Sequence, residues 1–429
     1  MNDIIRPLAQ GLHVLAKPMG PICDLKCDYC FYLEKKELFP EQEPFRMPDA
    51  VLAAYIEGYV NSQPTPEVEF VWHGGEPTLA GLDFFRRVVE LQRPFRAKKQ
   101  IRNSLQTHGM RLDDDWCAFL KTHNFLVGVS LDGPKEVHDR YRRDARGQGT
   151  FDRVVAGIRL LQKHQVDFNL MASVGRETAH RPLEVYQFFK ELGATFIQFT
   201  PIIERLPDAE TAAEGLWLAR PSALDKPEPQ AQVTPWTVEP EAYGDFLIAI
   251  YEEWVRQDVG TVFVMNFEWA LNAWLGQPSP ICIFARQCGK AVALEHDGSV
   301  FACDHYVYPE YRLGNILTEE LGAMVSRSVA GGFGPHKELS LPQYCQTCEV
   351  KEACWGGCPK HRFTLTPDGE PGLHYLCAGY KKFFLHIRKY LRAMAQLLEH
   401  GQPAARVMEA VRGPLAIPAR PPSGSGRAG

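Results

Sequence analysis

The stretch GPICDLKCDYCFYLEKK, residues 20–36, places three cysteines, Cys23, Cys27 and Cys30, within eight positions. A tetrahedral zinc site takes four ligands, and this stretch supplies only three. Three thiolates can instead hold three corners of a [4Fe–4S] cube, because iron–sulfur clusters take cysteine ligands. The fourth iron then stays open to an exogenous ligand. The spacing therefore predicts an iron–sulfur site with one open coordination position.

An open zinc site is the alternative interpretation of the same three thiols. Catalytic zinc sites usually combine cysteine with histidine or a carboxylate, and no such ligand is evident at this spacing. The iron–sulfur interpretation is therefore favoured, and a metal analysis of anaerobically purified protein would separate the two.

Twelve cysteines are distributed unevenly over the 429 residues. Three lie at 23–30, Cys117 stands alone and eight lie between 282 and 377. No segment is apolar enough for a signal-peptide core or a membrane span, which predicts a cytoplasmic protein. In a reducing cytosol, clustered thiols indicate metal or redox chemistry, whereas Cys117 is expected to be a small buried residue. The net charge of −5 predicts no binding to nucleic acid or to a membrane.

Short apolar runs alternate with amphipathic stretches between residues 11 and 203. Runs rich in β-branched residues predict strands, and amphipathic stretches of ten or more residues predict helices. Six strands in this alternation predict an α/β fold with a parallel sheet, enough for a partial, open (β/α)6 barrel. The expected strands are 12–18, 68–75, 103–109, 126–133, 167–175 and 196–203, and the expected helices are 48–60, 81–92, 113–123, 150–164 and 182–193.

Polar residues and glycines follow most of the expected strands, as in HGG at 73–75, QTHG at 106–109 and SLDG at 130–133. Active sites of parallel α/β folds gather at the carboxyl edge of the strands. The triple-cysteine loop follows the first strand, so we expect it at this same edge.

Four regions are expected along the chain. Residues 1–240 would form the partial barrel, within which the Pro-rich segment 204–240 is either a lid or an ordinary flexible insertion. A helical connection at 241–276 would lead to a cysteine-rich domain at 277–395. The tail at 396–429 ends in ARPPSGSGRAG and is expected to be partly disordered.

The triple-cysteine motif, with Tyr29 just before its third cysteine, resembles the signature of the radical S-adenosylmethionine (radical SAM) superfamily. The segment HGGEP at 73–77 resembles the glycine-rich segment that follows the second strand of that family. The resemblance implies that the methionine part of SAM chelates the open iron. The backbone of the HGGEP segment at Gly74, Gly75 and Glu76 would face the SAM amino group. The resemblance also implies that Ser130 and Arg142 hold the SAM carboxylate and that Ile203 packs on the adenine. Tyr29 is the remaining SAM-binding residue that it implies.

The eight later cysteines resemble the SPASM pattern of auxiliary iron–sulfur domains. Eight thiolates fill two four-cysteine clusters and leave no iron open. Closed clusters cannot bind substrate, so electron transfer or structural support is the expected role, although two structural zinc sites would also fit the number. The resemblance assigns one auxiliary cluster to Cys282, Cys288, Cys303 and Cys358, and the other to Cys345, Cys348, Cys354 and Cys377.

Among SPASM proteins, the chain is most similar to anaerobic sulfatase-maturating enzymes, in stretches such as VWHGGEPTLAGLDFF and GSVFACDHYVYPEYRLGNI. Those enzymes use a 5′-deoxyadenosyl radical to oxidise a cysteine or serine of an unfolded sulfatase to Cα-formylglycine. The resemblance implies three [4Fe–4S] clusters, SAM and a low-potential electron donor such as ferredoxin or flavodoxin. Asp304 matches the family's catalytic base, where a carboxylate beside Cys303 puts a proton acceptor next to an electron acceptor. Tyr32 is expected to contact the substrate.

Two other functions remain open on the sequence alone. One is a SPASM enzyme that crosslinks a ribosomally made peptide through thioether or carbon–carbon bonds, with the same fold, clusters and radical. The other is a non-enzymatic electron carrier or zinc scaffold. An electron carrier has no use for an open iron, so the triple-cysteine loop argues against the second alternative.

Overall fold

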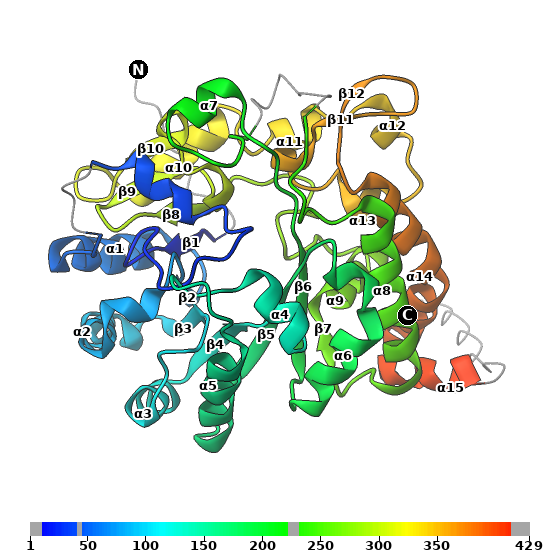
Figure 1. The fold of residues 1–429 in the computed structure, drawn as a ribbon, viewed down its shortest axis with the longest axis horizontal. Helices are drawn as coiled ribbons and strands as arrows, with labels where there is room; N and C mark the ends of the chain where they lie inside the picture. Colours follow the sequence, from blue (N-terminus) through cyan, green and yellow to red (C-terminus); the bar gives the residue numbers. More distant parts are fainter. Residues whose placement is uncertain (1–10, 41–44, 222–230, 413–429) are drawn as a thin grey trace, which may run out of the picture.

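Six parallel strands form the centre of the sheet, in the computed structural model of residues 11–40, 45–221 and 231–412. They lie side by side in chain order, and each neighbouring pair is parallel (Figure 1). All six expected strands are confirmed, as β1 His13–Ala16, β2 Glu67–Trp72, β3 Gln100–Thr107, β4 Phe125–Ser130, β5 Phe168–Val174 and β6 Phe196–Pro201.

Amphipathic helices cover the outer side of these strands (Figure 1). In α2, for example, Phe84, Phe85 and Val88 are buried while the arginines between them face solvent, as a helix with one apolar face requires. The five expected helices are confirmed, and a short α4 is added after β4. The helices of this half are α1 Asp49–Ser62, α2 Leu82–Gln92, α3 Asp114–Thr122, α4 Lys135–Tyr141, α5 Phe151–Lys163 and α6 Pro182–Glu191.

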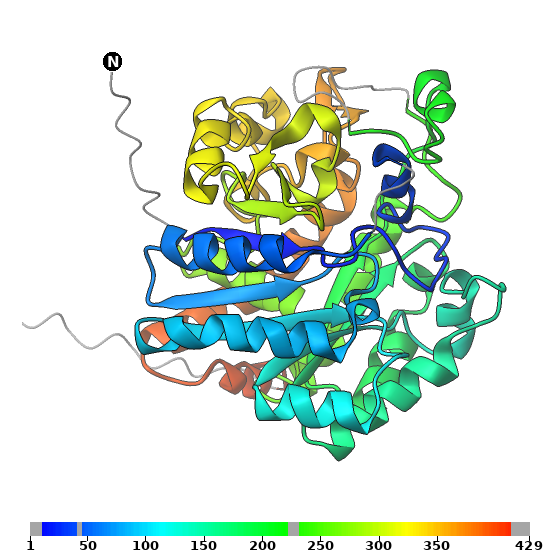
Figure 2. The ribbon, with the colours of Figure 1, turned by 90° about the vertical axis from the view of Figure 1, so that its left-hand side faces the viewer.

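The sheet continues past both ends of the six expected strands and reaches ten strands in all. The short β7 pairs with β6, and β8 pairs in parallel with β1. The antiparallel β9 and β10 then extend the sheet beyond β8. Figure 2 shows β8 to β10 and α10, in yellow-green to yellow, beside the blue N-terminal elements. Their bounds are β7 Phe263–Val264, β8 Ala291–Leu294, β9 Ser299–Phe301 and β10 Arg312–Asn315.

The strand pairing of β8 joins the cysteine-rich region to the barrel. Pairing at an edge satisfies backbone groups that would otherwise be open to another chain. The register runs from His13 opposite Ala291 to Ala16 opposite Leu294. The barrel and the cysteine-rich region therefore share one sheet, which fixes the region after β8 relative to the loop after β1.

The remaining elements are most of the helices and strands of the second half of the chain and the 3₁₀ turns of both halves. The α-helices and strands are α7 Ala209–Ala213, α8 Pro240–Gln257, α9 Met265–Trp274, α10 Leu321–Ala330, α11 His336–Leu339, α12 Gln343–Gln346, α13 Lys351–Cys354, β11 Thr364–Leu365, β12 Pro371–Leu373, α14 Cys377–Glu399 and α15 Val407–Arg412. The 3₁₀ turns are η1 Leu33–Leu38, η2 Pro77–Ala80, η3 Arg93–Ala97, η4 Thr178–His180, η5 Asp304–Tyr306, η6 Pro309–Tyr311, η7 Pro359–His361 and η8 Ala404–Arg406.

Two sequence predictions fall partly outside the described residues. The Pro-rich segment contains α7 and a backbone bridge between Arg205 and Val233, whereas residues 222–230 are not described. The expected tail is helical in its first part, through the end of α14 and α15, and residues 413–429 lie outside the description. Of the helices in the described ranges, none combines the length and apolarity needed to cross a membrane.

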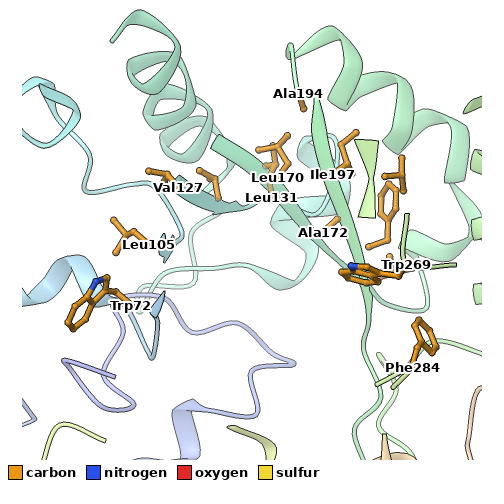
Figure 3. Close-up of a cluster of buried hydrophobic side chains, with 14 of the residues drawn as sticks. Trp72, Leu105, Val127, Leu131, Leu170, Ala172, Ala194, Ile197, Trp269 and Phe284 are labelled. Carbon is orange, nitrogen blue, oxygen red and sulfur yellow. The ribbon is translucent and has the colours of Figure 1, made fainter. Parts of the chain in front are cut away.

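A row of apolar side chains crosses the sheet and forms the centre of the core (Figure 3). Five successive strands each contribute one fully buried member, namely Trp72, Leu105, Val127, Leu170 and Ile197. Burying such side chains contributes about 1.5–3 kcal/mol each. Cys117 on α3 is also fully buried in this core, which confirms its prediction as a structural residue.

The longest helix, α14, packs against α8 through two glycines. A Cβ added to Gly244 would lie 2.7 Å from Cα of Gly379. A Cβ added to Gly379 would lie 1.9 Å from the carbonyl oxygen of Pro240. The two backbones therefore approach closely enough that only glycine fits, which sets how α14 lies against the barrel.

We predict that Gly244→Ala lowers the free energy of unfolding by about 1–3 kcal/mol, because the added methyl group forces α8 and α14 apart. The midpoint of thermal unfolding, followed by circular dichroism, measures the effect. Gly322→Ala in α10 is the matched control, because its Cβ would meet Ser62 at an ordinary 3.5 Å and alanine favours a helix. An unchanged midpoint for Gly244→Ala would show that α8 and α14 can accommodate the methyl group without moving apart.

Candidate active site

A cavity of about 360 Å³ lies at the carboxyl edge of the parallel strands. The loops after β1, β2, β4 and β6 reach its wall, and so does the segment after β9. Most of the residues that the sequence singles out meet here, although they come from distant parts of the chain. The predicted site residues on its wall are Cys23, Cys27, Tyr29, Cys30, Gly74, Gly75, Glu76, Ser130, Arg142, Ile203, Asp304 and Cys358.

The three thiols of the opening motif converge on this cavity. Burial raises the pKa of Cys23, Cys27 and Cys30, that of Cys27 to about 12. Neighbouring thiols raise the pKa of Cys23 and Cys27 further. Three thiolates therefore need a strongly cationic partner at this place, and an iron–sulfur cluster is such a partner. The donor set fits the cluster that the motif predicts.

The HGGEP segment lies directly against the cysteine loop. The N–H of Gly75 donates to the carbonyl of Gly20 at 2.8 Å, and that of Glu76 donates to the carbonyl of Ile22 at 2.8 Å. A Cβ on Gly75 would lie 2.0 Å from the Ile22 oxygen. Glycine is therefore required by the close approach of two backbones within the protein, a constraint that precedes any contact with a ligand.

The carboxylate of Glu76 is buried and holds the loops after β2 and β3 together. It accepts hydrogen bonds from Thr78 N at 3.0 Å, Thr107 Oγ1 at 2.7 Å and His108 N at 3.0 Å. Its side chain is thus satisfied by the protein. A SAM contact at this residue would have to come from its backbone, as the resemblance implies.

Arg142 reaches the cavity with its guanidinium already paired. Its Nε donates to Asp132 Oδ2 at 2.9 Å, and the same oxygen accepts from the Tyr29 hydroxyl at 2.6 Å. The other oxygen of Asp132 accepts from Ser173 N at 2.9 Å. Asp132 therefore fixes both Tyr29 and Arg142 at the wall. Ser130 lies nearby, where its hydroxyl accepts from Gln106 Nε2 at 3.1 Å.

Asp304 lies on the wall of the same cavity, in the segment after β9 and next to Cys303 in the chain. Its carboxylate forms an ion pair with the Nζ of Lys17, and 17% of its side chain remains exposed. Burial acts to raise the pKa of Asp304, but electrostatic interactions, of which the one with the Lys17 amine is the largest, outweigh it and lower the pKa to about 2. The group is therefore an ionised carboxylate near pH 7.

The structure places Tyr32, the predicted substrate contact, beside Lys17 and Glu295. The side chain is buried, and its hydroxyl donates to Glu295. Among the described residues that line the cavity, Tyr32 does not occur. Its ring lies beneath the amine of Lys17, 4.1 Å from the ring centre. The Tyr32 hydroxyl is thus engaged by Glu295, the residue that follows β8.

The eight later cysteines form two groups in space. Burial raises the pKa of Cys303 and that of Cys377, and thiols of the same group raise each further, Cys282 and Cys358 for Cys303, and Cys354 and Cys345 for Cys377. One group, which lines a cavity of about 290 Å³, is Cys282, Cys288, Cys303 and Cys358. The other, around a smaller cavity, is Cys345, Cys348, Cys354 and Cys377.

Each group has four thiols, so both sets fit a closed cluster. Cys358 belongs to the first group, whereas Cys354, four residues earlier, belongs to the second. A left-handed turn at Trp355, Gly356 and Gly357 separates the two cysteines. The buried Lys337 supports the loop of the first group, since its Nζ donates to the carbonyls of Cys282 at 2.8 Å and Ile283 at 3.0 Å.

A histidine and a carboxylate do lie beside Cys23, as a zinc site would require. Ligand atoms of Cys23, Asp24 and His108 fall within 4.8 Å of one another. However, His108 Nε2 and Asp24 Oδ1 are hydrogen-bonded at 2.6 Å, and Arg111 also contacts Asp24. These two side chains thus satisfy each other. They tie the cysteine loop to the loop after β3.

Several residues of the site received no individual role from the sequence. The only feature of Lys17 in the sequence was its position directly after an apolar strand. Asp132 and His108 stood in polar strand ends without an assigned partner, and Glu295 lay in an unremarkable stretch before β9. Each is defined by a contact with a residue far away along the chain, so spacing could not identify it.

Comparison with known families agrees with this geometry. Residues 18–189 match the family model described as the radical SAM superfamily, and residues 282–349 match the SPASM model, described as an iron–sulfur cluster-binding domain. The fold and the site thus define a radical SAM enzyme with a SPASM domain, whose cofactors are SAM and [4Fe–4S] clusters.

Comparison with individual proteins narrows the class. The chain is 42% identical, over 95% of its length and 96% of the relative's, to the serine-type anaerobic sulfatase-maturating enzyme of Bacteroides thetaiotaomicron. It is 32% identical to the cysteine-type enzyme of Clostridium perfringens, over 87% of this chain and 95% of the relative. The chain belongs to the anaerobic sulfatase-maturating enzymes.

A solved structure in the same family has the same fold. Native anSMEcpe with bound AdoMet and the Cp18Cys peptide superimposes with a TM-score of 0.77 at 31% identity. The match covers 90% of this chain and 99% of the other. The partial α/β barrel followed by a cysteine-rich SPASM domain is therefore confirmed.

We predict that Cys23→Ala abolishes cleavage of SAM, because two remaining thiolates cannot hold the cluster in place. The measurement is formation of 5′-deoxyadenosine by reconstituted protein under reducing conditions. Cys117→Ala is the matched control, since that thiol is buried in the core away from the cavity, and it is expected to retain cleavage. Continued deoxyadenosine formation by Cys23→Ala would overturn the assignment of the first cluster.

Proposed function

We propose that this protein oxidises a serine side chain of a sulfatase polypeptide to Cα-formylglycine. One observation carries the proposal: the carboxylate of Asp304 and the three thiols of Cys23, Cys27 and Cys30 line the same cavity. Preference for serine is supported by the identity of 42% to a serine-type relative against 32% to a cysteine-type relative.

The cofactors of this reaction would be held by the residues already described. Cys23, Cys27 and Cys30 would hold the first cluster, and the two groups of four later cysteines would hold two auxiliary clusters. SAM would contact the backbone of Gly74 to Glu76, with Tyr29, Ser130, Arg142 and Ile203 around it. When bound, the first cluster and SAM supply a 5′-deoxyadenosyl radical that removes a hydrogen atom from the substrate Cβ.

Asp304 would then accept the proton of the substrate hydroxyl. The oxidation of serine to an aldehyde removes two hydrogens, one as an atom from Cβ and one as a proton and an electron. Asp304 follows Cys303 directly in the chain, so the proton acceptor is adjacent to a ligand of the expected electron acceptor. A carboxylate placed in this way acts as a general base.

The charged groups of the wall are fixed before any substrate arrives. Asp132 holds the guanidinium of Arg142, and Lys17 holds Asp304. Groups that need no rearrangement stabilise a charged reaction centre more effectively than mobile ones. This supports a role for both Arg142 and Asp304 in the reaction.

The partners follow from the same proposal. The substrate would be a sulfatase polypeptide that is still unfolded, because the target residue must reach a cavity inside the protein. A low-potential donor such as ferredoxin or flavodoxin would supply the electron that cleaves SAM. Maturation of an unfolded chain by an oxygen-sensitive enzyme agrees with a cytoplasmic location.

We predict that Asp304→Asn leaves SAM cleavage in place and lowers formylglycine formation by about 10²–10⁴-fold, the usual contribution of a general base. Formylglycine is measured by mass spectrometry, and deoxyadenosine is measured in the same samples. Asp83→Asn, at an exposed side chain on α2, is the control and is expected to match the wild type. Wild-type yield from Asp304→Asn would remove this residue from the mechanism.

We predict that the protein converts a sulfatase-like peptide with a Ser-x-Pro-x-Arg segment to its aldehyde form. Reconstituted protein, SAM and a reductant are incubated with this peptide and with its Cys-x-Pro-x-Arg counterpart. An aldehyde-reactive probe and mass spectrometry report the product. Conversion of the cysteine peptide alone would contradict the serine preference. A crosslinked peptide, or deoxyadenosine without any change of either peptide, would contradict the proposed function itself.

A further inference from the structure

A fully buried lysine lies at the junction of the two cysteine-bearing regions. Lys17 is the first residue after β1, and its N–H donates to the carbonyl of Leu294 at the end of β8 at 2.8 Å. Its side chain is 0% exposed. Lysine is almost never fully buried unless its amine is paired, so the surroundings of the amine define its role.

Three side chains from three parts of the chain surround the amine. The Nζ of Lys17 forms an ion pair with Asp304 and lies 3.2 Å from Nδ1 of His73. It also lies 4.1 Å above the ring of Tyr32, in cation–π geometry. The lysine therefore spans the loop after β2, the cysteine loop and the segment after β9.

The ring beneath the amine is itself fixed. The hydroxyl of Tyr32 donates to one carboxylate oxygen of Glu295, and the other oxygen lies 3.2 Å from His296 Nδ1. Tyr32 and Glu295 are both buried. The amine thus rests on a ring that cannot turn freely, which restricts where its ion-pair partner can lie.

His73 is the second polar contact of the amine, and the hydrogen bonds define its tautomer. Nδ1 lies 2.7 Å from the N–H of Gly74 and 3.2 Å from the Lys17 amine. Two donors at one nitrogen make Nδ1 the acceptor, so a neutral ring carries its proton on Nε2. Burial, with the charge of Lys17, lowers the pKa of His73 to about 4, and the ring stays neutral near pH 7.

We propose that Lys17 is a positioning residue for the reaction, which holds the carboxylate of Asp304 at the cavity wall. This inference rests on the proposed function, in which Asp304 accepts the substrate proton. Lys17 is not among the described residues that line the cavity, whereas its ion-pair partner Asp304 and its polar contact His73 both are. The buried amine of Lys17 therefore fixes Asp304, from the segment after β9, relative to His73, in the loop after β2.

The alternative is a buried ion pair that only stabilises the fold. Breaking such a pair commonly costs several kcal/mol of stability, so a loss of stability cannot separate the two interpretations. A positioning role changes how often hydrogen abstraction leads to product. The decisive readout is therefore the ratio of formylglycine to deoxyadenosine, because unfolded protein forms neither and drops out of the ratio.

Lys17→Met tests the proposal, since methionine fills similar space without the amine. The proposal expects iron content and SAM cleavage near wild type, with the ratio of formylglycine to deoxyadenosine lowered by about 10–100-fold, the scale of a misplaced catalytic group. Lys35→Met is the matched control, because Lys35 is also a buried lysine beside a carboxylate, Glu34, but does not touch Asp304. A ratio lowered equally in both variants, or unchanged in Lys17→Met, would overturn the proposal.

The double variant Lys17→Met with Asp304→Asn shows whether the lysine acts through Asp304. If it does, the double variant has the same ratio as Asp304→Asn alone, because the positioned group is already lost. Multiplied losses would mean that Lys17 acts elsewhere and would overturn the proposal. The double variant also removes both buried charges together, so it remains informative if Lys17→Met alone folds poorly.

Failure of the proposed function can be recognised separately. If the wild type forms no formylglycine from either peptide, crystal structures of the wild type and of Lys17→Met decide the positioning claim. The claim expects the Asp304 carboxylate to leave its place at the cavity wall in the variant. An Asp304 side chain in the same place in both structures would overturn it.

Discussion

The parallel pairing of β1 with β8 is the interaction on which the rest of the structure depends. It runs over four residues of each strand, from His13 opposite Ala291 to Ala16 opposite Leu294. The first cysteine loop follows one strand, and the hairpin that ends in Cys303 and Asp304 follows the other. Because β9 returns antiparallel beside β8, the segment after β9 comes back alongside β1, where Asp304 pairs with Lys17 and lines the same cavity as the open-cluster loop. A shift of register by one residue would turn the side chains of β8 to the opposite face.

Three ion pairs at this edge join different segments of the chain. Lys17 pairs with Asp304, Arg142 pairs with Asp132, and Lys360 pairs with Glu204 at 2.8 Å. An unpaired charge in such a place would be costly, because burial removes its hydration. The pairs therefore hold the segments together and at the same time leave carboxylates and a guanidinium in defined places around the cavity. Stability and chemistry use the same contacts here.

Much of the architecture could be predicted from the sequence. The six strands and five helices of the barrel follow from local apolar patterns, which depend on neighbours within a few residues. The triple-cysteine loop and HGGEP are also local, and both lie where the strand order predicts. The position of Tyr32 after Cys30 said nothing of Glu295, the group to which its hydroxyl donates. The extension of the sheet by β8 to β10 was missed because short strands pair across long sequence distances.

The sequence by itself determined the open three-thiol site, the number of later thiols and the carboxylate beside Cys303, since these are matters of residue type and local spacing. Only the tertiary structure decided which four cysteines meet, that Arg142 is held by Asp132, and that Lys17 meets Asp304 and His73. The physical reason is that such contacts depend on strand register and on turns such as the one at Trp355 to Gly357. Those features set distances between residues far apart in the chain, and no local pattern records them.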